Sequence, residues 1–379
     1  MSTMPESSTL SFVLEQFFPS HQCLEIERID NGHIHETLSA RLQTPQGTQD
    51  VVLQRMNQHV FPHPEQVMEN ILLVTRHLQE SYLAEEQNPE GRVLHFFATP
   101  SGEYLIRDST GEVWRAAQKI PNARTYETTQ DFKILFEVAW AFGDFQRRLI
   151  SLEGMRLHET IPQFHYTRKR FNDFIQAVEQ DAYNRALSVR QDIEYLQRRE
   201  DNVDIVADAL AKGHLPSRVT HNDTKINNVL MDRTSGNALC VIDLDTVMPG
   251  SILYDFGDLV RSAANTALED EKDLSRVHFD VPRFIQLARG FLSAIRETLS
   301  PLEWELLAFA PRLITLEQAL RFLTDYLQGD VYYRTAHPQH NLHRARTQIR
   351  LLQEMEQQAG LMESILERCK TDSTLGRFS

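Results

Sequence analysis

The hydrophobic pattern of this chain changes at about residue 118, and this change limits the folds that the chain can adopt. Before it, three short runs are separated by the turn sequences NGHIHET and PQGTQ: LEIERID (24–30), LSARLQT (38–44) and DVVLQRM (50–56). Runs of strand length between such turns pair with their neighbours in antiparallel order. The pattern therefore predicts three antiparallel strands near the start of the chain.

One helix is expected within this first part. Pro64 fits the first position of a helix, and apolar residues then recur at helical spacing through PEQVMENILLVTRHLQE (64–80). Two strand-like runs follow, at 92–99 and 103–108, and a third run occupies 113–120. Together these elements predict a small lobe that is rich in strands.

The remainder of the chain is predicted to be mainly helical. Residues 131–150 are apolar on most sides, as in a buried helix, and further helices are expected over 166–212 and from about 279 to 368. Only the strand-forming pieces VLMD and ALCVIDLD interrupt them. The two patterns predict an α+β protein with a small lobe over 1–118, a larger helical lobe over 119–379, and a ligand cleft between them.

The charge and cysteine content argue against several classes of protein. The 379 residues include 39 basic and 53 acidic side chains, and the net charge of −14 argues against nucleic acid or an anionic membrane as the main partner. The three cysteines lie far apart without metal or disulfide spacing, which favours a reducing cytoplasm. Neither a signal-peptide pattern nor a run of about 18 apolar residues is present, so secretion and membrane spanning are not expected.

The stretch HNDTKINN (221–228) places several polar residues directly before a strand. VLMD and ALCVI flank the turn sequence RTSGN and therefore predict a β-hairpin. Asn228 and Asp243 are equally distant from the centre of this turn, so a regular register places them opposite each other, about 5 Å apart at Cα. An amide oxygen and a carboxylate at that separation can bind one hard cation, which makes this pair a candidate Mg²⁺ site.

Asp223 and Lys225 lie in the same loop. A carboxylate at residue 223 can accept a proton from an attacking hydroxyl, and an ammonium group at residue 225 can stabilise a transferred phosphoryl group. The spacing from Asp223 to Asn228, followed by an Asp across a hairpin, is typical of phosphotransferring kinases. Taken singly, each residue also has an ordinary explanation as a cap, an Asx turn or a solvated charge, and the same holds for Asp245.

Stretches spread over nearly the whole chain carry a family resemblance. They are NGHIHET, VVLQRMN, VFPHPEQVMENI, AFGDFQ, RVTHNDTKINN, IDLDTVMPGS, YDFGD, TALEDEKDLSRVHF, RFLTDYLQGDVYY and HNLHRARTQI. With them the chain resembles the aminoglycoside phosphotransferase and choline kinase-like superfamily of small-molecule kinases. The resemblance implies a two-lobed protein kinase-like fold with a nucleotide-binding N-terminal lobe and a catalytic, substrate-binding C-terminal lobe. It further implies transfer of the ATP γ-phosphate to the anomeric hydroxyl of N-acetylglucosamine or N-acetylgalactosamine.

The resemblance also implies roles for individual residues. Asp223 is expected as the catalytic base, and Asn228 and Asp243 as Mg²⁺ ligands. Asp255, in YDFGD, and His221 are expected to support the catalytic loop. The remaining assignments are Lys225 at the transferred phosphoryl group, Gln54 and Gly32 at the nucleotide, and His33, Arg321 and Tyr332 at the sugar. For Tyr332, packing in the core is an equal alternative.

Two residues depart from the pattern of the family. Asn222 stands where many relatives have a glycine, and Gln54 stands where many have a Lys or Arg that pairs with the nucleotide phosphates. Because a neutral Gln cannot neutralise a phosphate, Mg²⁺ or another cation has to carry more of the charge. Two other functions stay open: a kinase of the same fold for another small alcohol, such as choline, an aminoglycoside or another sugar, and a non-catalytic scaffold.

The histidines do not predict a metal site. His33, His35 and the group His337, His340 and His343 have no acidic or cysteine partner at metal-ligand spacing. Surface or hydrogen-bonding roles are therefore favoured for them. The sequence leaves the oligomeric state open.

Overall fold

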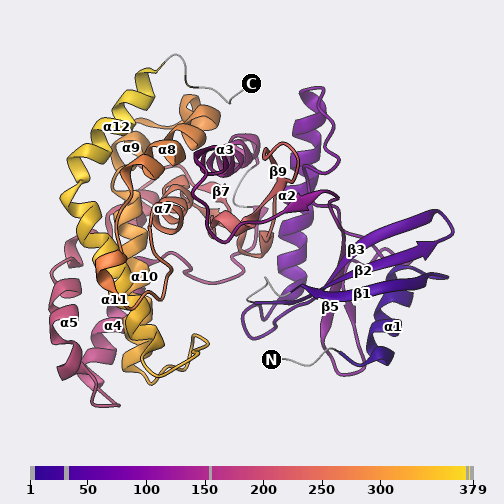
Figure 1. The fold of residues 1–379 in the computed structure, drawn as a ribbon, viewed down its shortest axis with the longest axis horizontal. Helices are drawn as coiled ribbons and strands as arrows, with labels where there is room; N and C mark the ends of the chain where they lie inside the picture. Colours follow the sequence, from indigo (N-terminus) through magenta and orange to yellow (C-terminus); the bar gives the residue numbers. More distant parts are fainter. Residues whose placement is uncertain (1–4, 30–33, 153–155, 373–374, 376–379) are drawn as a thin grey trace.

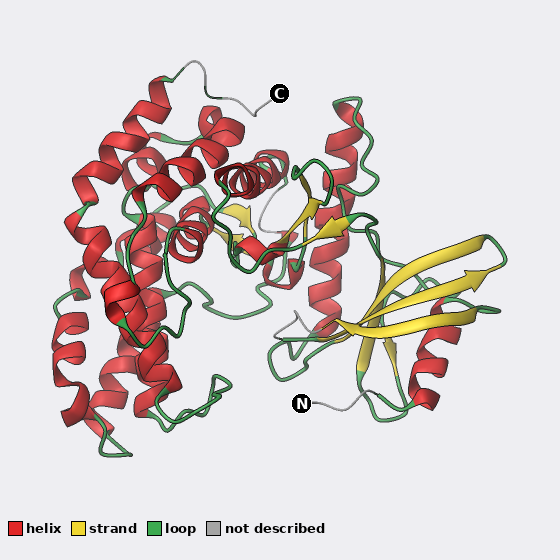
Figure 2. Cartoon of the chain, in the orientation of Figure 1, coloured by secondary structure: helices red, strands yellow, loops and turns green. Residues whose placement is uncertain are grey.

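An antiparallel sheet forms one end of the molecule and helices form the other (Figure 1, Figure 2). The computed structural model describes residues 5–29, 34–152, 156–372 and 375. In the sheet, the strands follow the order β1-β2-β3-β5-β4. They are β1 (Gln22–Ile29), β2 (Glu36–Thr44), β3 (Gly47–Arg55), β4 (Ile106–Arg107) and β5 (Val113–Gln118). The first three are the antiparallel strands predicted from the sequence, so that prediction is confirmed.

The run at 92–99 is not a continuous strand, so the prediction for it is wrong. Phe96 pairs through an isolated bridge with Ala117, and the run at 103–108 shortens to β4. The side chains of Val93 and Phe96 are buried in the same hydrophobic cluster as α2 (Pro64–Ala84), the helix predicted to begin at Pro64. Packing in this cluster buries the apolar run without a strand ladder and overrides the strand preference of its residues.

Helix α1 (Ser7–Phe17), which the sequence pattern did not predict, covers one face of the sheet. Its buried residues recur at helical spacing and pack with the fully buried Trp114 of β5. Because side chains alternate along a strand, the neighbours of Trp114, Val113 and Arg115, point to the opposite face. That face turns toward α2, since Val113 belongs to the cluster that contains α2.

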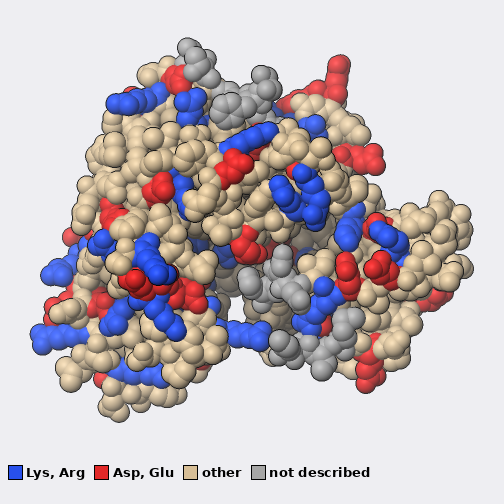
Figure 3. Space-filling model, in the orientation of Figure 1, with Lys and Arg blue, Asp and Glu red and all other residues tan. Residues whose placement is uncertain are grey.

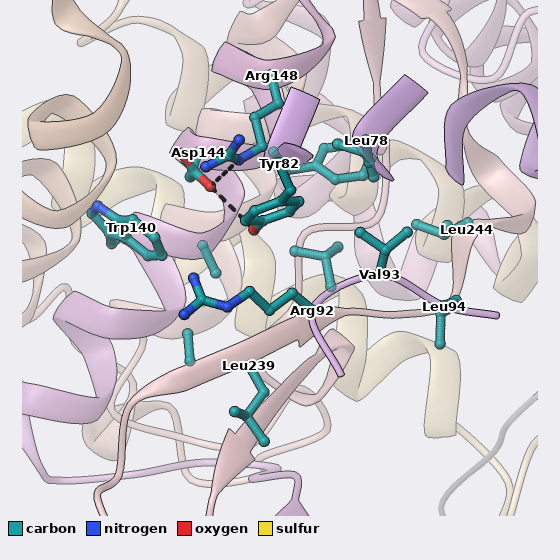
Figure 4. Close-up of a pocket in the computed structure, with 14 residues that line it drawn as sticks. Leu78, Tyr82, Arg92, Val93, Leu94, Trp140, Asp144, Arg148, Leu239 and Leu244 are labelled. Carbon is teal, nitrogen blue, oxygen red and sulfur yellow. Dashed lines mark hydrogen bonds and ion pairs between the residues drawn. The ribbon is translucent and has the colours of Figure 1, made fainter. Parts of the chain in front are cut away.

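Helix α2 contacts the helical part of the protein at its C-terminal end. Tyr82 of α2 donates a hydrogen bond to Asp144 of α3 (Phe132–Leu149) at 3.4 Å, and Arg148 Nε donates to the same carboxylate at 2.7 Å (Figure 4). Burial and the charge of Asp144 raise the pKa of Tyr82 to about 12, so its hydroxyl stays protonated. The adjoining cavity of about 30 Å³ has room for about one water molecule, which is too small for a ligand.

The second part of the chain is mainly helical, as predicted. After α3, its helices are α4 (Thr167–Gln180), α5 (Arg190–Gln197), α6 (Ile205–Ala211), α7 (Ile252–Ala263), α8 (Val281–Ile295), α9 (Pro301–Leu306), α10 (Ala310–Leu327), α11 (His340–Gln357) and α12 (Ala359–Thr371). α3, α7 and α8 share one hydrophobic cluster, and α4, α5, α10 and α11 share another. The domain boundary expected after residue 118 falls at the end of β5 and stays a prediction.

None of the helices in the described ranges is long and apolar enough to cross a membrane. On the face drawn in Figure 3, Lys and Arg side chains lie among Asp and Glu side chains, without a large area of one sign. The same face is hollowed between the helical part and the sheet (Figure 3). A mixed surface of this kind offers no basic track for a nucleic-acid backbone on this face.

The predicted hairpin forms from β8 (Val229–Asp232) and β9 (Ala238–Val241), but its register differs from the prediction by one residue. The backbone N–H of Ile242 donates to the carbonyl oxygen of Asn228 at 2.9 Å. Asn228 therefore faces Ile242, and Asp243 lies one residue farther along the chain. The expectation that Asn228 and Asp243 are direct cross-strand partners is wrong.

Two local features cause this shift of register. The turn closes through a hydrogen bond from the N–H of Asp232 to the carbonyl oxygen of Asn237, one residue away from the predicted centre. This turn alone would shift the partner of Asn228 by two residues, and a bulge that leaves Leu239 unpaired on β9 moves the register back by one. The neighbouring strands are β6 (Ala123–Arg124) beside β8, and the pair β7 (Arg218–Thr220) and β10 (Met248–Gly250).

The close approach of α3 and α8 yields a prediction on stability. A Cβ atom on Gly290 of α8 would overlap the carbonyl oxygen of Phe136 on α3, and one on Gly143 of α3 would overlap that of Phe291. Gly290→Ala should therefore lower the free energy of unfolding by about 1–3 kcal/mol, since backbone cannot yield as a side chain can. Urea denaturation measures the change.

The control is Gly360→Ala in α12, where an added Cβ meets nothing within 4 Å. This substitution should leave the unfolding midpoint unchanged or raise it slightly, because alanine favours a helix over glycine. Equal midpoints for the variants at 290 and 360 would contradict the proposed role of the glycine at the α3–α8 contact.

Candidate active site

One buried carboxylate holds the loop between β7 and β8. Asp255, in the first turn of α7, accepts hydrogen bonds from the backbone N–H groups of His221 (2.9 Å) and Asn222 (2.7 Å). Gln146 of α3 donates to the same carboxylate. The hydroxyl of Thr224 donates to the carbonyl oxygen of Asp255 at 2.6 Å. The start of α7 thus fixes the backbone of the loop that carries Asp223.

The backbone conformation of Asn222 explains why this position accepts Asn where many relatives have a glycine. Its φ of +65° lies in the left-handed region, which glycine adopts freely and Asn adopts more readily than most other residues. The Asn222 side chain accepts a hydrogen bond from Thr220 Oγ1 and donates one to the carbonyl oxygen of Thr246, both at 2.9 Å. Asn therefore keeps the required backbone conformation and adds two contacts that glycine lacks.

The ring of His221 connects this loop to the end of the hairpin. Nε2 donates to the carbonyl oxygen of Ile242 at 2.9 Å, and Nδ1 accepts from the backbone N–H of Asp223 at 3.3 Å. The ring is fully buried and packs edge-on against Phe142. His221 therefore holds the residue before Asp243 and the backbone of Asp223 at a fixed separation.

Asp223 lies in a cluster of polar groups from its own loop. Lys225 Nζ is 2.8 Å from Oδ1, and Asn228 Nδ2 is 3.0 Å from Oδ2. Burial acts to raise the pKa of Asp223, but the charge of Lys225 outweighs it and holds the pKa below its usual value. The Asp223 carboxylate is therefore ionised at neutral pH, and its side chain keeps 20% exposure toward solvent.

Asn228 and Asp243 offer oxygen atoms beside Asp223. Because Asn228 directs its amide nitrogen to Asp223, its amide oxygen points to the other side. Burial, together with the charges of Asp245 and Asp223, raises the pKa of Asp243 to about 6. A cation would relieve this repulsion, and an amide oxygen with carboxylate oxygens is a donor set that fits Mg²⁺.

Asp245 forms a buried ion pair with strand β5. Nη1 and Nη2 of Arg115 donate to its two carboxylate oxygens at 2.9 and 2.6 Å, and the two side chains are 3% and 2% exposed. His35 Nε2 lies 3.3 Å from the same carboxylate. Burial opposes ionisation of Asp245, but Arg115 and His35 outweigh it and hold its pKa far below the usual range. The alternative that Asp245 is a solvated strand-end carboxylate is therefore wrong.

Gln54 lies beside Arg115 on the neighbouring strand. It accepts a hydrogen bond from Arg115 Nε at 2.9 Å and donates to Thr37 at 3.4 Å. A cation therefore does stand next to the neutral Gln54, but its donors are directed to Asp245 and to Gln54. Arg115 was not predicted from the sequence, although a charged residue inside the apolar run VWRAA is itself a signal of a buried partner.

The residues predicted at the sugar are only partly described. Arg321 and Tyr332 line a cavity of about 320 Å³ beside α10, whereas His33 lies outside the described residues, as does Gly32, which was predicted at the nucleotide. In this cavity the hydroxyl of Tyr333 and Nε of Arg170 are buried and have no hydrogen-bond partner among the described residues. The wall of the cavity therefore contains polar atoms whose hydrogen bonds are incomplete.

A series of side-chain contacts connects this cavity to the loop that carries Asp223. The guanidinium of Arg321 lies 5.6 Å from the centre of the Phe164 ring, and Phe164 packs edge-on against His165. Nε2 of His165 in turn contacts the carbonyl oxygen of Asn222 at 3.1 Å. A ligand in the cavity and the loop with Asp223 are thus linked through one layer of side chains.

The fold supplies an acidic neighbour for the histidines near residue 340. Asp270 lies with His337 and His340, and His340 Nε2 is 3.1 Å from its carboxylate. His340 Nδ1, however, accepts a hydrogen bond from the backbone N–H of Ala336 at 3.0 Å. A metal-bound histidine donates from its second nitrogen, so these contacts agree with the hydrogen-bonding role favoured from the sequence.

An antiparallel N-terminal sheet joined to a mainly helical C-terminal part is the α+β kinase-like fold, as predicted. The protein is similar to an aminoglycoside phosphotransferase from Alicyclobacillus acidocaldarius, with a TM-score of 0.59 and 14% identity over 95% of this chain and 98% of that chain. Spectinomycin phosphotransferase in complex with ADP and spectinomycin gives 0.57 and 13%, over 95% and 99%. Choline kinase from Cryptosporidium parvum gives 0.54 and 13%, over 95% and 98%.

The sequence itself shows the family. Residues 26–287 match the phosphotransferase enzyme family, and the chain belongs to it. It therefore belongs to a family of phosphotransferases and has the same fold as an aminoglycoside phosphotransferase and a choline kinase.

The buried pair between the sheet and the hairpin gives a prediction on stability. Asp245→Asn leaves the Arg115 guanidinium buried without its counter-charge, so the free energy of unfolding should fall by about 3–5 kcal/mol. Asp50→Asn is the control, because the Asp50–Arg41 pair is 38% and 49% exposed. Its loss should cost at most about 1 kcal/mol in urea denaturation. Similar losses in the two variants would show that the buried pair does not tie the sheet to the hairpin.

Proposed function

We propose that this protein is an ATP- and Mg²⁺-dependent N-acetylhexosamine 1-kinase, which phosphorylates the anomeric hydroxyl of N-acetylglucosamine or N-acetylgalactosamine. The proposal adds a substrate to the phosphotransferase class established above. The proposed compartment is the cytoplasm, which the cysteine spacing favours.

The charged residues that line the cavity beside α10 favour a neutral acceptor over a cationic one. Arg170 and Arg321 bring two guanidinium groups to it. Of its acidic residues, Asp173 is paired with Lys169 at 2.6 Å, and Asp325 accepts hydrogen bonds from backbone N–H groups. A cationic acceptor such as choline or an aminoglycoside would meet unfavourable charge here. A neutral sugar with an acetamido group instead offers oxygen atoms to the guanidinium groups and a face to the tyrosines.

The catalytic loop supports a mechanism with Asp223 as the base. In it the Asp223 carboxylate accepts the proton of the anomeric hydroxyl as the oxygen attacks the γ-phosphorus, and the β-phosphate oxygen of ADP departs. The anomeric hydroxyl is more acidic than other sugar hydroxyls, so a carboxylate with a lowered pKa suffices. Lys225, whose side chain is 43% exposed, lies where it can contact the transferred phosphoryl group.

The remaining groups of the site bind the nucleotide in this proposal. Asn228 and Asp243 would hold Mg²⁺, which supplies positive charge to the β- and γ-phosphates. The amide nitrogen of Gln54 would hydrogen-bond a phosphate oxygen, and Gly32 would allow close approach of the backbone. Arg115 neutralises Asp245. Of the two carboxylates at the end of the hairpin, Asp243 would therefore be the one whose negative charge faces the nucleotide.

The substrate is tested with a panel of acceptors, namely N-acetylglucosamine, N-acetylgalactosamine, glucose, choline and kanamycin, with Mg²⁺ and ATP. An N-acetylhexosamine should give a kcat/KM at least about 100-fold above that for choline, because the guanidinium groups of the half-buried Arg170 and Arg321 repel a cation. ³¹P NMR should place the phosphate on carbon 1. Phosphorylation of choline or kanamycin, with no N-acetylhexosamine turned over, would refute the proposed substrate.

The base is tested by Asp223→Asn. Turnover should fall by about 10²–10⁴-fold, since the carboxylate that accepts the proton is lost while nucleotide contacts remain. Calorimetric titration with ADP and Mg²⁺ should show that the nucleotide still binds. Asp208→Asn, at an exposed helix pair with Lys212, is the control and should keep full activity. If Asp223→Asn keeps about a tenth of the activity, the residue is not the base.

A further inference from the structure

Three charged residues lie on one face of α10, a helix of which most residues are buried. Glu317, Arg321 and Asp325 follow each other at intervals of four residues, so their side chains project from the same side. Glu317 is 1% and Asp325 is 3% exposed. Charged side chains are almost never buried without partners, and the partners here belong to two functional loops.

Glu317 is linked to the catalytic loop through His165. His165 Nδ1 contacts Glu317 Oε1 at 2.9 Å, and Nε2 contacts the carbonyl oxygen of Asn222 at 3.1 Å. Both of these partners only accept hydrogen bonds, so both ring nitrogens must donate and the ring is an imidazolium. Thr167 donates to the second oxygen of Glu317 at 2.7 Å, which completes the set of partners of this carboxylate.

The charge balance of this contact agrees with its geometry. Burial acts to lower the pKa of His165, but the charge and hydrogen bond of Glu317, with Asp258 and the carbonyl of Asn222, together raise the pKa above its usual value. The pKa of Glu317 is lowered, because His165 outweighs the opposing effect of burial. The other titratable groups facing His165 come from α7, namely Asp258, whose charge also favours the imidazolium, and Tyr254, whose ring is 4.9 Å away.

The contact falls on the residue directly before the proposed base. The backbone N–H of Asn222 is held by Asp255 of α7, and its carbonyl oxygen is held by His165 and therefore by α10. Asn222 has a left-handed backbone conformation, which sets the direction in which the chain enters Asp223. Because the backbone N–H and the carbonyl oxygen of Asn222 are both held, the peptide planes on either side of it are fixed. The second of these planes leads into Asp223.

Asp325 holds the loop that follows α10. Its Oδ1 accepts from the backbone N–H groups of Val331 (2.9 Å) and Tyr332 (2.7 Å). Its Oδ2 accepts from the backbone N–H of Tyr333 (2.9 Å) and from Asn341 Nδ2 (2.8 Å). One buried carboxylate thus shapes the segment that brings both tyrosines to the cavity beside α10.

We propose that α10 sets the position of the acceptor relative to the catalytic loop, with Glu317 and His165 as positioning residues for Asp223 and Asp325 as the positioning residue for Tyr332 and Tyr333. This inference rests on the proposed use of the cavity as the acceptor site. Eight residues of helix separate the two carboxylates by about 12 Å, and a helix packed on all sides keeps that distance. A shift of about 1 Å between reacting groups can cost about 100-fold in rate, so such a fixed distance matters for phosphoryl transfer.

Two substitutions on the same helix test the proposal. Glu317→Gln removes the counter-charge of His165 and should lower kcat by about tenfold or more, with the acceptor KM changed by less than about threefold. Asp325→Asn leaves the Tyr333 N–H without an acceptor and should raise the acceptor KM by about tenfold or more, with the ATP KM unchanged. Steady-state kinetics with the best acceptor of the panel, of whatever class, provides both values.

The matched control is Glu354→Gln in α11. Glu354 is also a buried carboxylate that contacts a histidine, His278, at 3.0 Å and accepts from a backbone N–H, that of Phe279. It contacts neither the catalytic loop nor the cavity beside α10 in the contacts of the described residues. Its substitution should lower the melting temperature in the same way and leave kcat and both KM values unchanged.

The pH profile separates positioning from general stability. A raised pKa means that the imidazolium contact is present at lower pH and is lost as the pH rises through the pKa of His165 in the folded protein. Glu317→Gln should move the alkaline decline of kcat to lower pH, because the ring has lost its main counter-charge. Glu354→Gln should leave that decline where it is in the unaltered protein.

The outcomes distinguish this inference from the proposed function. If Glu317→Gln keeps kcat within about twofold, or if kcat and KM change in equal proportion in both α10 variants, the positioning role is refuted even when an N-acetylhexosamine is the substrate. If another acceptor is the substrate and the split between kcat and KM appears with it, the proposed substrate fails and the positioning role stands. If no acceptor of the panel reacts, the rate of Mg²⁺-dependent ATP hydrolysis is measured in place of acceptor phosphorylation. An unchanged rate of hydrolysis in Glu317→Gln would then refute the positioning role of Glu317.

Discussion

The hydrogen bonds that Asp255 accepts from the backbone of His221 and Asn222 are the constraint on which the site depends. A carboxylate with no exposed surface is unfavourable unless its partners are complete, and here they are backbone N–H groups of one loop and the amide of Gln146. Its place in the first turn of α7 adds the favourable dipole of the helix. Because α7 belongs to the largest hydrophobic cluster, the packing of that core determines where the loop and Asp223 lie.

The carboxylates of the site differ in how their charge is balanced, and the differences separate their roles. Asp223 is paired with Lys225 within its own loop, and Asp245 is paired with Arg115 from the sheet. No Lys or Arg in the described part of the chain is paired with Asp243, and its pKa is raised to about 6. Since a buried ion pair contributes little net stability, the Arg115 contact is better understood as a geometric tie between sheet and hairpin. It leaves Asp243 as the carboxylate with charge available for a cation.

The sequence predicted those parts of the fold that depend on local pattern. The strands before residue 56 and the helix that begins at Pro64 follow from periodicity and turn residues, and both are present. The strand predicted at 92–99 does not form, because its apolar side chains are buried by packing with α2 and not by pairing in a sheet. The predicted hairpin register is wrong because the turn closes between Asp232 and Asn237, one residue before the predicted centre, and the bulge at Leu239 recovers only part of this shift. Contacts over long sequence separations, such as Arg115 with Asp245, depend on the whole fold and were not predicted.

The contacts of the loop that carries Asp223 indicate why, in the proposed function, this loop would not determine which acceptor binds. The loop residues contact mainly each other, the hairpin and α7, so in the proposed function they would fix the geometry of phosphoryl transfer without contacting the rest of the acceptor. The groups that differ in charge toward a cation or a sugar lie on α4 and α10, and they include Arg170 and Arg321. If the cavity beside α10 is the acceptor site, as proposed, a change of acceptor would need changes on these two helices and in the loop held by Asp325, while the loop around Asp223 could stay as it is.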